Sequence, residues 1–526
     1  MADTFARRLE RLAFRFVEFV FGALFRLLYR GPGEQVPPIS NLLLLDSATT
    51  LAHKIRTKKV TSVEVVEAFI ARIREVNLVL NTVVDERFEE ALKEAKAADE
   101  YIRSGTHTPE ELERNLPFLG VPFTTKDCVQ VKGLRHTAGL YKRRNLVATE
   151  DADCVAQMRA AGAFPLAVTN VSELCMWWES NNTIYGRTRN PYNTNRIVGG
   201  SSGGEGCLQA AAGSPMGIGT DIGGSIRMPA FFNGIFGHKP SRGVVSNAGQ
   251  YPIPNGEQNT FLGTGPMTRF ATDLLPIFKV LAGPVSSERL GLKGPPPDLR
   301  KVKVFYAEDD GGGRLISAVQ PDQRAAIKRA VNHLEKALGI KAKKIHLPRL
   351  KKALPIWFAK MQIKDAPTFA QQLDNCEGTV NIFLELVKWA LFMSKHTFIG
   401  LFTAIMEKNG VQAGSETHTL LLNECVRLRQ DFQDILGDDG VFLFPTHPTV
   451  APFHNEPALK PYNFSYTAIF NVLGFPATQC PLGLGSEGLP LGLQVIANLN
   501  QDRLTLAMAC ELEKAFGGWV PPAIAV

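Results

Sequence analysis

The sequence lacks a long uninterrupted hydrophobic segment and carries little excess charge. In 526 residues, 58 Lys and Arg oppose 51 Asp and Glu, which gives a net charge of +7. This excess is too small for a dedicated nucleic-acid binder, so we expect no nucleic-acid partner. Apolar residues make up 45% and charged residues 21% of the chain. That composition excludes a disordered protein and is sufficient for a large buried core.

The eight cysteines form no CxxC pair and no close cluster. A disulfide framework or a zinc site would need such spacings. We therefore expect reduced thiols, most of them buried, and no bound metal.

The N-terminal residues 1–30 carry a disproportionate share of the charge, with six arginines against three acidic residues. Their longest uncharged run, Phe19 to Phe25, is far shorter than the ~20 residues of a membrane-spanning helix. One face of a helix over this segment would be polar, interrupted only at Gly22, and the opposite face apolar. The polar face holds Arg8, Arg11, Arg15, Glu18, Arg26 and Arg30, and the apolar face Leu9, Leu12, Phe16, Val20, Ala23 and Leu27, flanked by Phe14, Phe19, Phe21 and Phe25.

This pattern predicts an amphipathic helix that lies on a membrane surface. Two alternatives remain open: the helix packs on its own core, or it packs on a second subunit in a homodimer. A cleaved signal peptide is disfavoured because Arg15 and Glu18 interrupt the apolar segment.

The rest of the chain reads as an α/β protein. Gly31, Pro32 and Gly33 begin a linker over 31–42, and residues 43–526 are predicted to form a single domain. Helical patterns cover 47–104, 321–338 and 354–406, and a helix closes the chain. Short apolar runs alternate with glycine-rich turns over 117–245, and further strands are predicted within 301–308 and 441–526.

Residues 199–206, GGSSGGEG, contain five glycines in eight positions. Such a loop lets the backbone approach a phosphate or an oxyanion closely. A Walker A loop would end in Gly-Lys-Ser/Thr, but Glu205 stands there, so nucleotide binding is disfavoured. Ser201 and Ser202 could instead join a hydrogen-bond relay. The alternative is a tight structural turn.

A second glycine–serine segment, GTDIGGSIR, covers residues 219–227. We predict that Ser225 caps a short helix, with Gly223 and Gly224 before it. Backbone amides would then converge on one point, as an oxyanion hole requires, and each donor is worth about 3 kcal/mol of barrier. The alternative is an ordinary capping serine.

A serine nucleophile needs a base, and the expected histidine is missing. No GxSxG elbow surrounds either serine, and His238 lies in GHKP, which reads as a structural turn. Lys126 ends the apolar run GVPFTT. Burial would have to lower its pKa from about 10.4 to about 8 for it to act as a base, at a cost of roughly 3 kcal/mol. The alternative is a surface lysine paired with Asp127.

Together the segments GVPFTTKD, GGSSGGEG and GTDIGGSIRMPA resemble the three hallmark segments of the amidase signature family of serine hydrolases. The resemblance is strong over 115–245 and weaker over 441–526, and within the family it is greatest to the fatty-acid amide hydrolases. It implies an α/β fold with a large mixed β-sheet core flanked by helices on both faces.

The resemblance also implies the roles of individual residues. Ser225 would be the nucleophile, Lys126 the base, and Ser201, preceded by a cis peptide, the proton carrier between them. Backbone amides of Ile222, Gly223, Gly224 and Ser225 would form the oxyanion hole, and the backbone near Cys175 would line the site. Ser202 and the pair Asp221 and Arg227 would hold the two loops in register. No cofactor and no metal are implied.

Residues 380–406 form an unusually apolar segment, interrupted only by Glu385, Lys388, Lys395 and the titratable His396. The segment belongs to a predicted apolar helical cap at 354–406. It could cover an acyl channel or dip into a bilayer. The alternative is a buried helix pair.

The two apolar segments together predict a membrane-associated hydrolase of fatty-acid amides, such as primary fatty amides and N-acylethanolamines. We expect it at an intracellular membrane, on the endoplasmic reticulum or a lipid-droplet surface. The alternatives are a soluble small-amide amidase, an amidotransferase-like subunit, and a non-catalytic membrane-binding scaffold.

Overall fold

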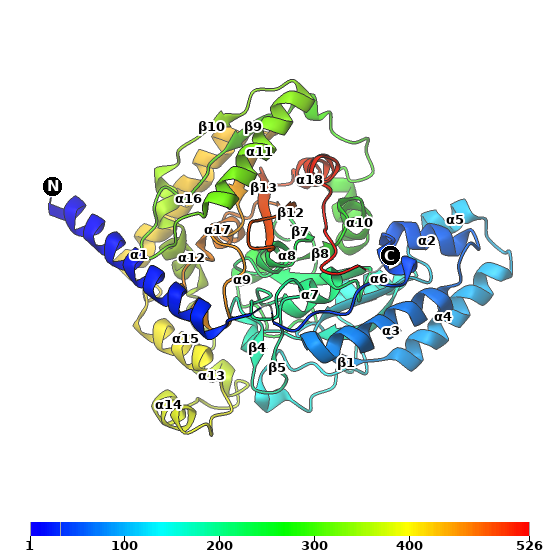
Figure 1. The fold of residues 1–526 in the computed structure, drawn as a ribbon, viewed down its shortest axis with the longest axis horizontal. Helices are drawn as coiled ribbons and strands as arrows, with labels where there is room; N and C mark the ends of the chain where they lie inside the picture. The colour runs from blue at the N-terminus through cyan, green and yellow to red at the C-terminus, as the bar shows by residue number, and fades with distance from the viewer. Residues whose placement is uncertain (1, 32, 525–526) are drawn as a thin grey trace.

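The computed structural model describes residues 2–31 and 33–524. One large sheet lies at the centre of the fold, with helices around it (Figure 1). Its strands lie in the order β1-β3-β2-β6-β8-β7-β12-β13-β11-β9-β10. The bounds are β1 Val83–Glu86, β2 Pro122–Lys126, β3 Phe164–Thr169, β6 Met216–Asp221, β7 Phe236–Lys239, β8 Gly263–Thr268, β9 Lys303–Tyr306, β10 Lys343–Lys344, β11 Gly440–Pro445, β12 Ala477–Leu484 and β13 Pro490–Ala497. Strands β4 Asn181–Asn182 and β5 Gly186–Arg187 form a separate pair.

The sheet is mixed, as the family resemblance implied. Strand β2 is parallel to both β3 and β6, whereas β6 is antiparallel to β8. Every residue of β2, β3 and β6 is buried. Because parallel neighbours end at the same edge of a sheet, the carboxyl ends of β2, β3 and β6 meet there. This edge brings together residues that are about 100 positions apart in sequence.

Helices pack against the sheet on both faces. Helices α7 and α8 contact each other and the central strands, and α10 and α18 form a second such pair. The helices are α1 Ala2–Leu28, α2 Ala48–Arg56, α3 Ser62–Leu80, α4 Phe88–Arg103, α5 Pro109–Asn115, α6 Asp153–Ala160, α7 Gly203–Ala210, α8 Arg227–Phe232, α9 Gln258–Phe261, α10 Ala271–Arg289, α11 Pro321–Leu338, α12 Ala353–Met361, α13 Phe369–Leu373, α14 Ile382–Ala390, α15 Phe398–Asn409, α16 Glu416–Leu436, α17 Ser465–Leu473 and α18 Asp502–Phe516.

Most predicted elements are confirmed, and one region is corrected. Helix α11 occupies 321–338 as predicted, with Pro321 in the first turn, where its missing N–H costs nothing. The region 47–104 is not purely helical, because β1 pairs with β3 after α3 ends at the left-handed Asn81. Tertiary pairing at the sheet edge thus overrides a helical pattern.

Among its described side chains, helix α1 contacts the rest of the protein at Glu10 and Glu18, and Tyr29, just beyond the helix, adds a third contact. Glu10 pairs with Arg314 at 2.7 Å, the Ser317 hydroxyl donates to Glu18, and Tyr29 stacks on Phe453 with ring centroids 5.5 Å apart. The predicted apolar face points away from these contacts, since Phe16 is 68% exposed. The side chains of residues 2–9 and 11, which include Leu9, Arg8 and Arg11 of the predicted faces, lie outside the described residues, as does Pro32 of the linker.

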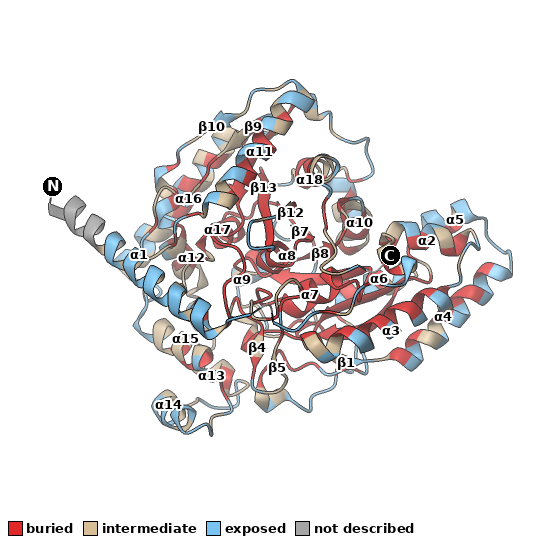
Figure 2. Cartoon of the chain, viewed as in Figure 1, coloured by how far each residue is buried: buried red, intermediate tan, exposed pale blue. Residues whose placement is uncertain are grey.

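Helix α14 is similarly open to solvent, and Figure 2 shows both helices largely in the exposed colour. None of its nine residues is buried, and Phe392, just after it, is 99% exposed. The alternative of a buried helix pair at 380–406 is therefore wrong for α14, while α15 buries Leu401 and Ala404. Within the described residues, no helix combines the length and apolar character needed to cross a membrane.

Candidate active site

Lys126 is the last residue of β2 and is completely buried. Its Nζ lies 2.9 Å from Ser201 Oγ and 2.7 Å from Thr220 Oγ1. No carboxylate of the described residues forms an ion pair with it. The alternative of a surface lysine paired with Asp127 is wrong, because Asp127 points elsewhere and accepts hydrogen bonds from the amide and the hydroxyl of Thr137.

Ser201 and Ser202 stand at the start of α7, beside the carboxyl edge of the parallel strands. The Gly200–Ser201 peptide bond is cis, as the resemblance implied. The amide of Ser202 donates to the carbonyl of Ser225 over 3.2 Å, and the Ser202 hydroxyl lies 3.4 Å from the carbonyl oxygen of Thr220. Ser202 thereby joins the two glycine–serine loops.

Ser225 lies just before α8, next to this junction, and its side chain borders a large cavity. The prediction that Ser225 caps the helix is wrong by one position: the capping residue is Ile226, and no side chain of Ile226 or Ser225 caps α8. The Asp221 carboxylate instead accepts from the amides of Ile226 and Arg227, at 3.1 and 3.4 Å. Among the described residues the Ser225 hydroxyl has no hydrogen-bond partner, so it is not committed to a structural role.

Asp221 and Arg227 form a completely buried ion pair within the second loop. Both Nε and Nη2 of Arg227 lie 3.0 Å from the Asp221 carboxylate. Burial alone would raise the pKa of Asp221, but the charge and hydrogen bonds of Arg227 lower it to about 2. Arg227 also donates to Gln494 and Asn471. The pair therefore anchors this loop to β13 and α17, while Ser202 makes the contact between loops.

The four amides predicted to form an oxyanion hole differ in availability. The amide of Gly224 donates to Asp221 Oδ1 over 2.7 Å, so this part of the prediction is wrong for the structure as it stands. Across the described residues, the amides of Ile222, Gly223 and Ser225 have no acceptor. Three donors thus remain beside the Ser225 hydroxyl.

Two buried carboxyl groups flank Lys126 without forming ion pairs. Burial raises the pKa of Glu205 to about 7 and that of Asp127 to about 7, against hydrogen bonds that lower both. The Glu205 carboxyl accepts from the hydroxyls of Thr124 and Thr169, the residues that neighbour Lys126 on β2 and β3. Glu205 therefore belongs to the wall behind the lysine and does not mark a phosphate loop.

The cavity in front of the two serines has a volume of about 1100 Å³. Ser201, Ser225 and Cys175 line it, together with Ile222 and Gly223 of the free amides. Its walls continue along mainly apolar side chains of the cap, namely Trp357, Phe358, Met361, Phe369, Ile382, Phe383, Leu386, Phe402 and Ile405. The two serines thus border the same cavity as side chains of α12, α14 and α15.

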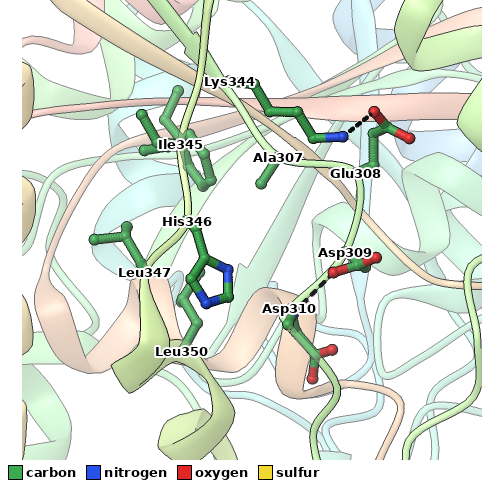
Figure 3. A pocket seen from close by; sticks show the side chains of 11 residues that line it. Ala307, Glu308, Asp309, Asp310, Lys344, Ile345, His346, Leu347 and Leu350 are labelled. Carbon is green, nitrogen blue, oxygen red and sulfur yellow. Dashed lines mark hydrogen bonds and ion pairs between the residues drawn. The ribbon is translucent and has the colours of Figure 1, made fainter.

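A smaller pocket of about 310 Å³ lies at the far edge of the sheet, beyond β9 and β10 (Figure 3). Its lysine and carboxylate side chains are already paired: Lys344 Nζ is 2.5 Å from Glu308, and Asp310 accepts from the amides of Gly312 and Gly313. Neither serine of the predicted relay lines it, so it is not the reaction site.

His238 and the cysteines were predicted to have structural roles. His238 lies in β7, not in a turn, and its ring nitrogens contact Thr478 Oγ1 and the Asp502 carboxylate at 2.8 and 3.3 Å. All eight cysteines are free thiols, five of them buried. Within the described part of the chain, no group of three or more His, Cys, Asp or Glu residues is arranged to hold a metal ion.

Sequence reasoning missed three side chains of the site. Thr220 receives a hydrogen bond from Lys126, Trp357 Nε1 donates to the carbonyl of Ile222, and Thr467 Oγ1 lies 2.7 Å from the carbonyl of Gly223. Thr220 could have been found, because it directly precedes Asp221 in the second loop. Trp357 and Thr467 carried no signal, since they come from distant helices.

Comparisons with known proteins identify relatives of the whole chain. A family model described as amidase matches residues 64–506. Fatty-acid amide hydrolase 2-A of Danio rerio is 48% identical over 525 residues, which cover 98% of each chain. A glutamyl-tRNA(Gln) amidotransferase subunit of a Marinomonas species is 28% identical over 491 residues, 89% of this chain and 96% of its own. A solved fatty acid amide hydrolase shares the fold with a TM-score of 0.73 at 23% identity, covering 91% of this chain and 86% of that one.

The chain therefore belongs to the amidase family, the amidase signature hydrolases. It is an amide-hydrolysing enzyme, which excludes the non-catalytic scaffold.

Proposed function

We propose that this enzyme hydrolyses fatty-acid amides at a membrane surface, through an acyl-enzyme on Ser225. The observation that carries the proposal is the buried Lys126–Ser201 hydrogen bond beside a large cavity whose lining is mainly apolar. The high identity to a fatty-acid amide hydrolase over nearly the whole chain supports the same substrate class. The products are a fatty acid and an amine, or ammonia when the substrate is a primary amide.

The proposed reaction moves one proton along three side chains. Ser225 Oγ attacks the amide carbonyl while its proton passes to Ser201 Oγ, and the Ser201 proton passes to neutral Lys126 Nζ. The proton then returns through Ser201 to the amine nitrogen as the carbon–nitrogen bond breaks, because an amine leaves poorly unless it is protonated. Water hydrolyses the resulting ester by the same route and releases the fatty acid.

The proposed route requires Lys126 Nζ to lie within hydrogen-bond distance of Ser201 and away from bulk water. Its Nζ contacts two uncharged hydroxyls and is cut off from water. The Ser225 hydroxyl has no partner in the described residues, and we propose that it turns to Ser201 when the amide binds, since catalytic hydrogen bonds often close only in the substrate complex.

The cavity fits an acyl chain better than a small polar amide. Its volume of about 1100 Å³ lies above the ~300–1,000 Å³ typical of ligand pockets. Aliphatic and aromatic side chains of α12, α14 and α15 line it, beside polar ones such as Lys364 and Glu407. The amidotransferase-like alternative is less favoured, since that relative is only 28% identical. A soluble small-amide amidase would not need so large a cavity.

Membrane association is proposed from two exposed apolar surfaces. The outer face of α1 presents Leu12, Phe16 and Phe19, which are 63–68% exposed. The α14 segment presents Phe383, Leu391 and Phe392, which are 62–99% exposed. Contiguous exposed apolar side chains of this kind mark interaction sites. In Figure 1 both segments lie on the left-hand side of the molecule.

The second surface adjoins the cavity, because Phe383 and Leu386 of α14 line it. A substrate dissolved in a bilayer could therefore enter without crossing water. We propose an intracellular membrane, on the endoplasmic reticulum or a lipid-droplet surface; the free cysteines fit a reducing compartment.

Hydrolysis of oleamide by the purified enzyme, compared with propionamide, tests the substrate class. The proposal predicts a much larger kcat/KM for oleamide and no turnover by Ser225→Ala. A fluorophosphonate probe should label Ser225, and an adduct located by mass spectrometry on another residue would overturn the nucleophile assignment. A preference for propionamide would reject the lipid substrate while leaving the relay intact.

A further inference from the structure

Trp357 lies at the junction of the cavity wall and the loop that carries the free amides. It is the fifth residue of α12 and is 5% exposed. Its Nε1 donates to the carbonyl oxygen of Ile222 over 2.9 Å. This hydrogen bond connects two segments that are 135 positions apart in sequence.

The position of this carbonyl determines the direction of the next amide. A trans peptide unit is planar, and its C=O and N–H point in opposite directions. By fixing the Ile222 carbonyl, Trp357 therefore fixes the Gly223 N–H, which faces away from the indole. That amide has no acceptor within the described residues, and Gly223 borders the cavity beside Ser225.

Among the described residues, no other side chain forms a hydrogen bond with this peptide unit. Glycine residues at 223 and 224 leave the backbone free to rotate, and the nearest side-chain contact of Gly223 is the Trp357 ring itself, 3.4 Å from where a Cβ would stand. Thr467 fixes the following carbonyl, that of Gly223, and so orients the Gly224 amide toward Asp221. Trp357 thus orients the Gly223 amide, and Thr467 orients the Gly224 amide.

The indole is itself held in place by aromatic packing. The Phe464 ring lies edge-on to it with centroids 5.0 Å apart, and the Phe358 ring with centroids 5.3 Å apart. A rigid donor of this kind is what a pre-organised oxyanion site requires, since the donors must not reorganise as charge develops.

We propose that Trp357 is a positioning residue of the oxyanion hole, which acts by holding the Gly223 amide toward the carbonyl oxygen of the substrate. The inference rests on Ser225 being the nucleophile, as proposed above. Removing a donor from an oxyanion hole lowers kcat by about 10²–10³-fold. Loosening one donor should cost less, and we expect a decrease of roughly 10–100-fold for Trp357→Phe, with KM changed less than about threefold.

Two ligands separate positioning from mere structural support. A long-chain trifluoromethyl ketone forms a tetrahedral adduct with a serine and places an anionic oxygen in the hole, whereas oleyl alcohol fills the acyl cavity without that charge. Trp357→Phe should weaken the ketone by about the same factor as kcat and leave the alcohol nearly unchanged. Phe402→Leu is the matched control: it changes a ring of the same cavity wall that packs on Phe398 and not on the indole, and it should raise KM and weaken both ligands equally.

The inference is overturned if Trp357→Phe keeps normal kcat and ketone affinity, or if it weakens ketone and alcohol equally. Should Trp357→Phe not fold, β-(3-benzothienyl)alanine at position 357 replaces only the N–H by sulfur and is measured in the same way. Ser225→Ala is assayed in parallel. Turnover of oleamide by Ser225→Ala would refute the proposed nucleophile, whereas an inactive Ser225→Ala beside a normal Trp357→Phe would refute the role of Trp357 alone.

Discussion

Replacing Glu205 by glutamine should make the protein more stable at alkaline pH and change the pH dependence of its unfolding. Glu205 is completely buried and has hydroxyl and amide partners, Thr124, Thr169 and Gln209, but no ion-pair partner among the described residues. Burial is the main cause that raises its pKa from 4.5 to about 7. Because the folded state then binds the proton more tightly, this group stabilises the fold fully below pH 4.5, and the contribution is lost as the pH rises through about 7.

The size of the effect follows from the shift. A difference of roughly 2.5 pH units at 1.36 kcal/mol each corresponds to about 3 kcal/mol. Glutamine resembles the protonated acid and does not titrate. Glu205→Gln should therefore match the parent near pH 4 and gain roughly 3 kcal/mol relative to it by pH 8.

Urea unfolding followed by tryptophan fluorescence at several pH values between about 3 and 8 measures this difference and covers the range in which the control titrates. The control is Glu64→Gln, because backbone and side-chain hydrogen bonds from Thr61 lower the pKa of Glu64. Its stabilising contribution is present at neutral pH and lost as the pH falls below 4.5, so the control should show the opposite slope. Parallel stability curves for the parent and Glu205→Gln would refute the reasoning. Asp127, with its own raised pKa, would leave a residual slope in both.

Three further predictions concern the proposed relay, the buried ion pair and the N-terminal helix α1. Lys126→Met should lower kcat by roughly 10²–10⁴-fold. Thr220→Val should lower kcat by about tenfold, because it removes one hydrogen bond. If Lys126→Met and the parent have equal kcat, Lys126 is not the base. Asp221→Asn should cost about 3–5 kcal/mol of unfolding free energy because it leaves Arg227 buried without its charge partner, and a change below about 1 kcal/mol in urea unfolding would contradict this. Deleting residues 1–30 should reduce co-sedimentation with anionic vesicles and preserve turnover of a soluble amide. Unchanged sedimentation would count against the interfacial helix. Phe392→Ser tests the second exposed surface in the same assay.

The fold and the position of the site could be predicted from local patterns. The apolar run before Lys126 predicts a buried strand, and burial of that strand follows because both its neighbours are parallel to it. The two glycine–serine loops were found for a similar reason: several glycines close together allow close backbone approach, and that signal is contained within eight or nine residues.

Predictions were less successful where two acceptors compete for the same backbone amide. Ser225 is a good helix cap by residue type, but Asp221 reaches the same amides from four positions earlier and carries a full charge. The same carboxylate takes the Gly224 amide from the predicted oxyanion hole. Competition between two acceptors for one donor is decided by three-dimensional distance, which residue types do not reveal.

The sequence by itself determined the chemistry available to this protein: a lysine at the end of a buried strand, two serines in glycine-rich loops, and two apolar segments that exceed what a core requires. Residue type and spacing suffice for that, because both are local. Only the tertiary structure decided which groups meet. The parallel pairing of β2 and β6 brings Lys126 to Thr220, and the packing of α12 against the second loop brings Trp357 to Ile222. These contacts join residues 94 and 135 positions apart, and they exist only because burying the apolar faces of strands and helices stabilises this one arrangement.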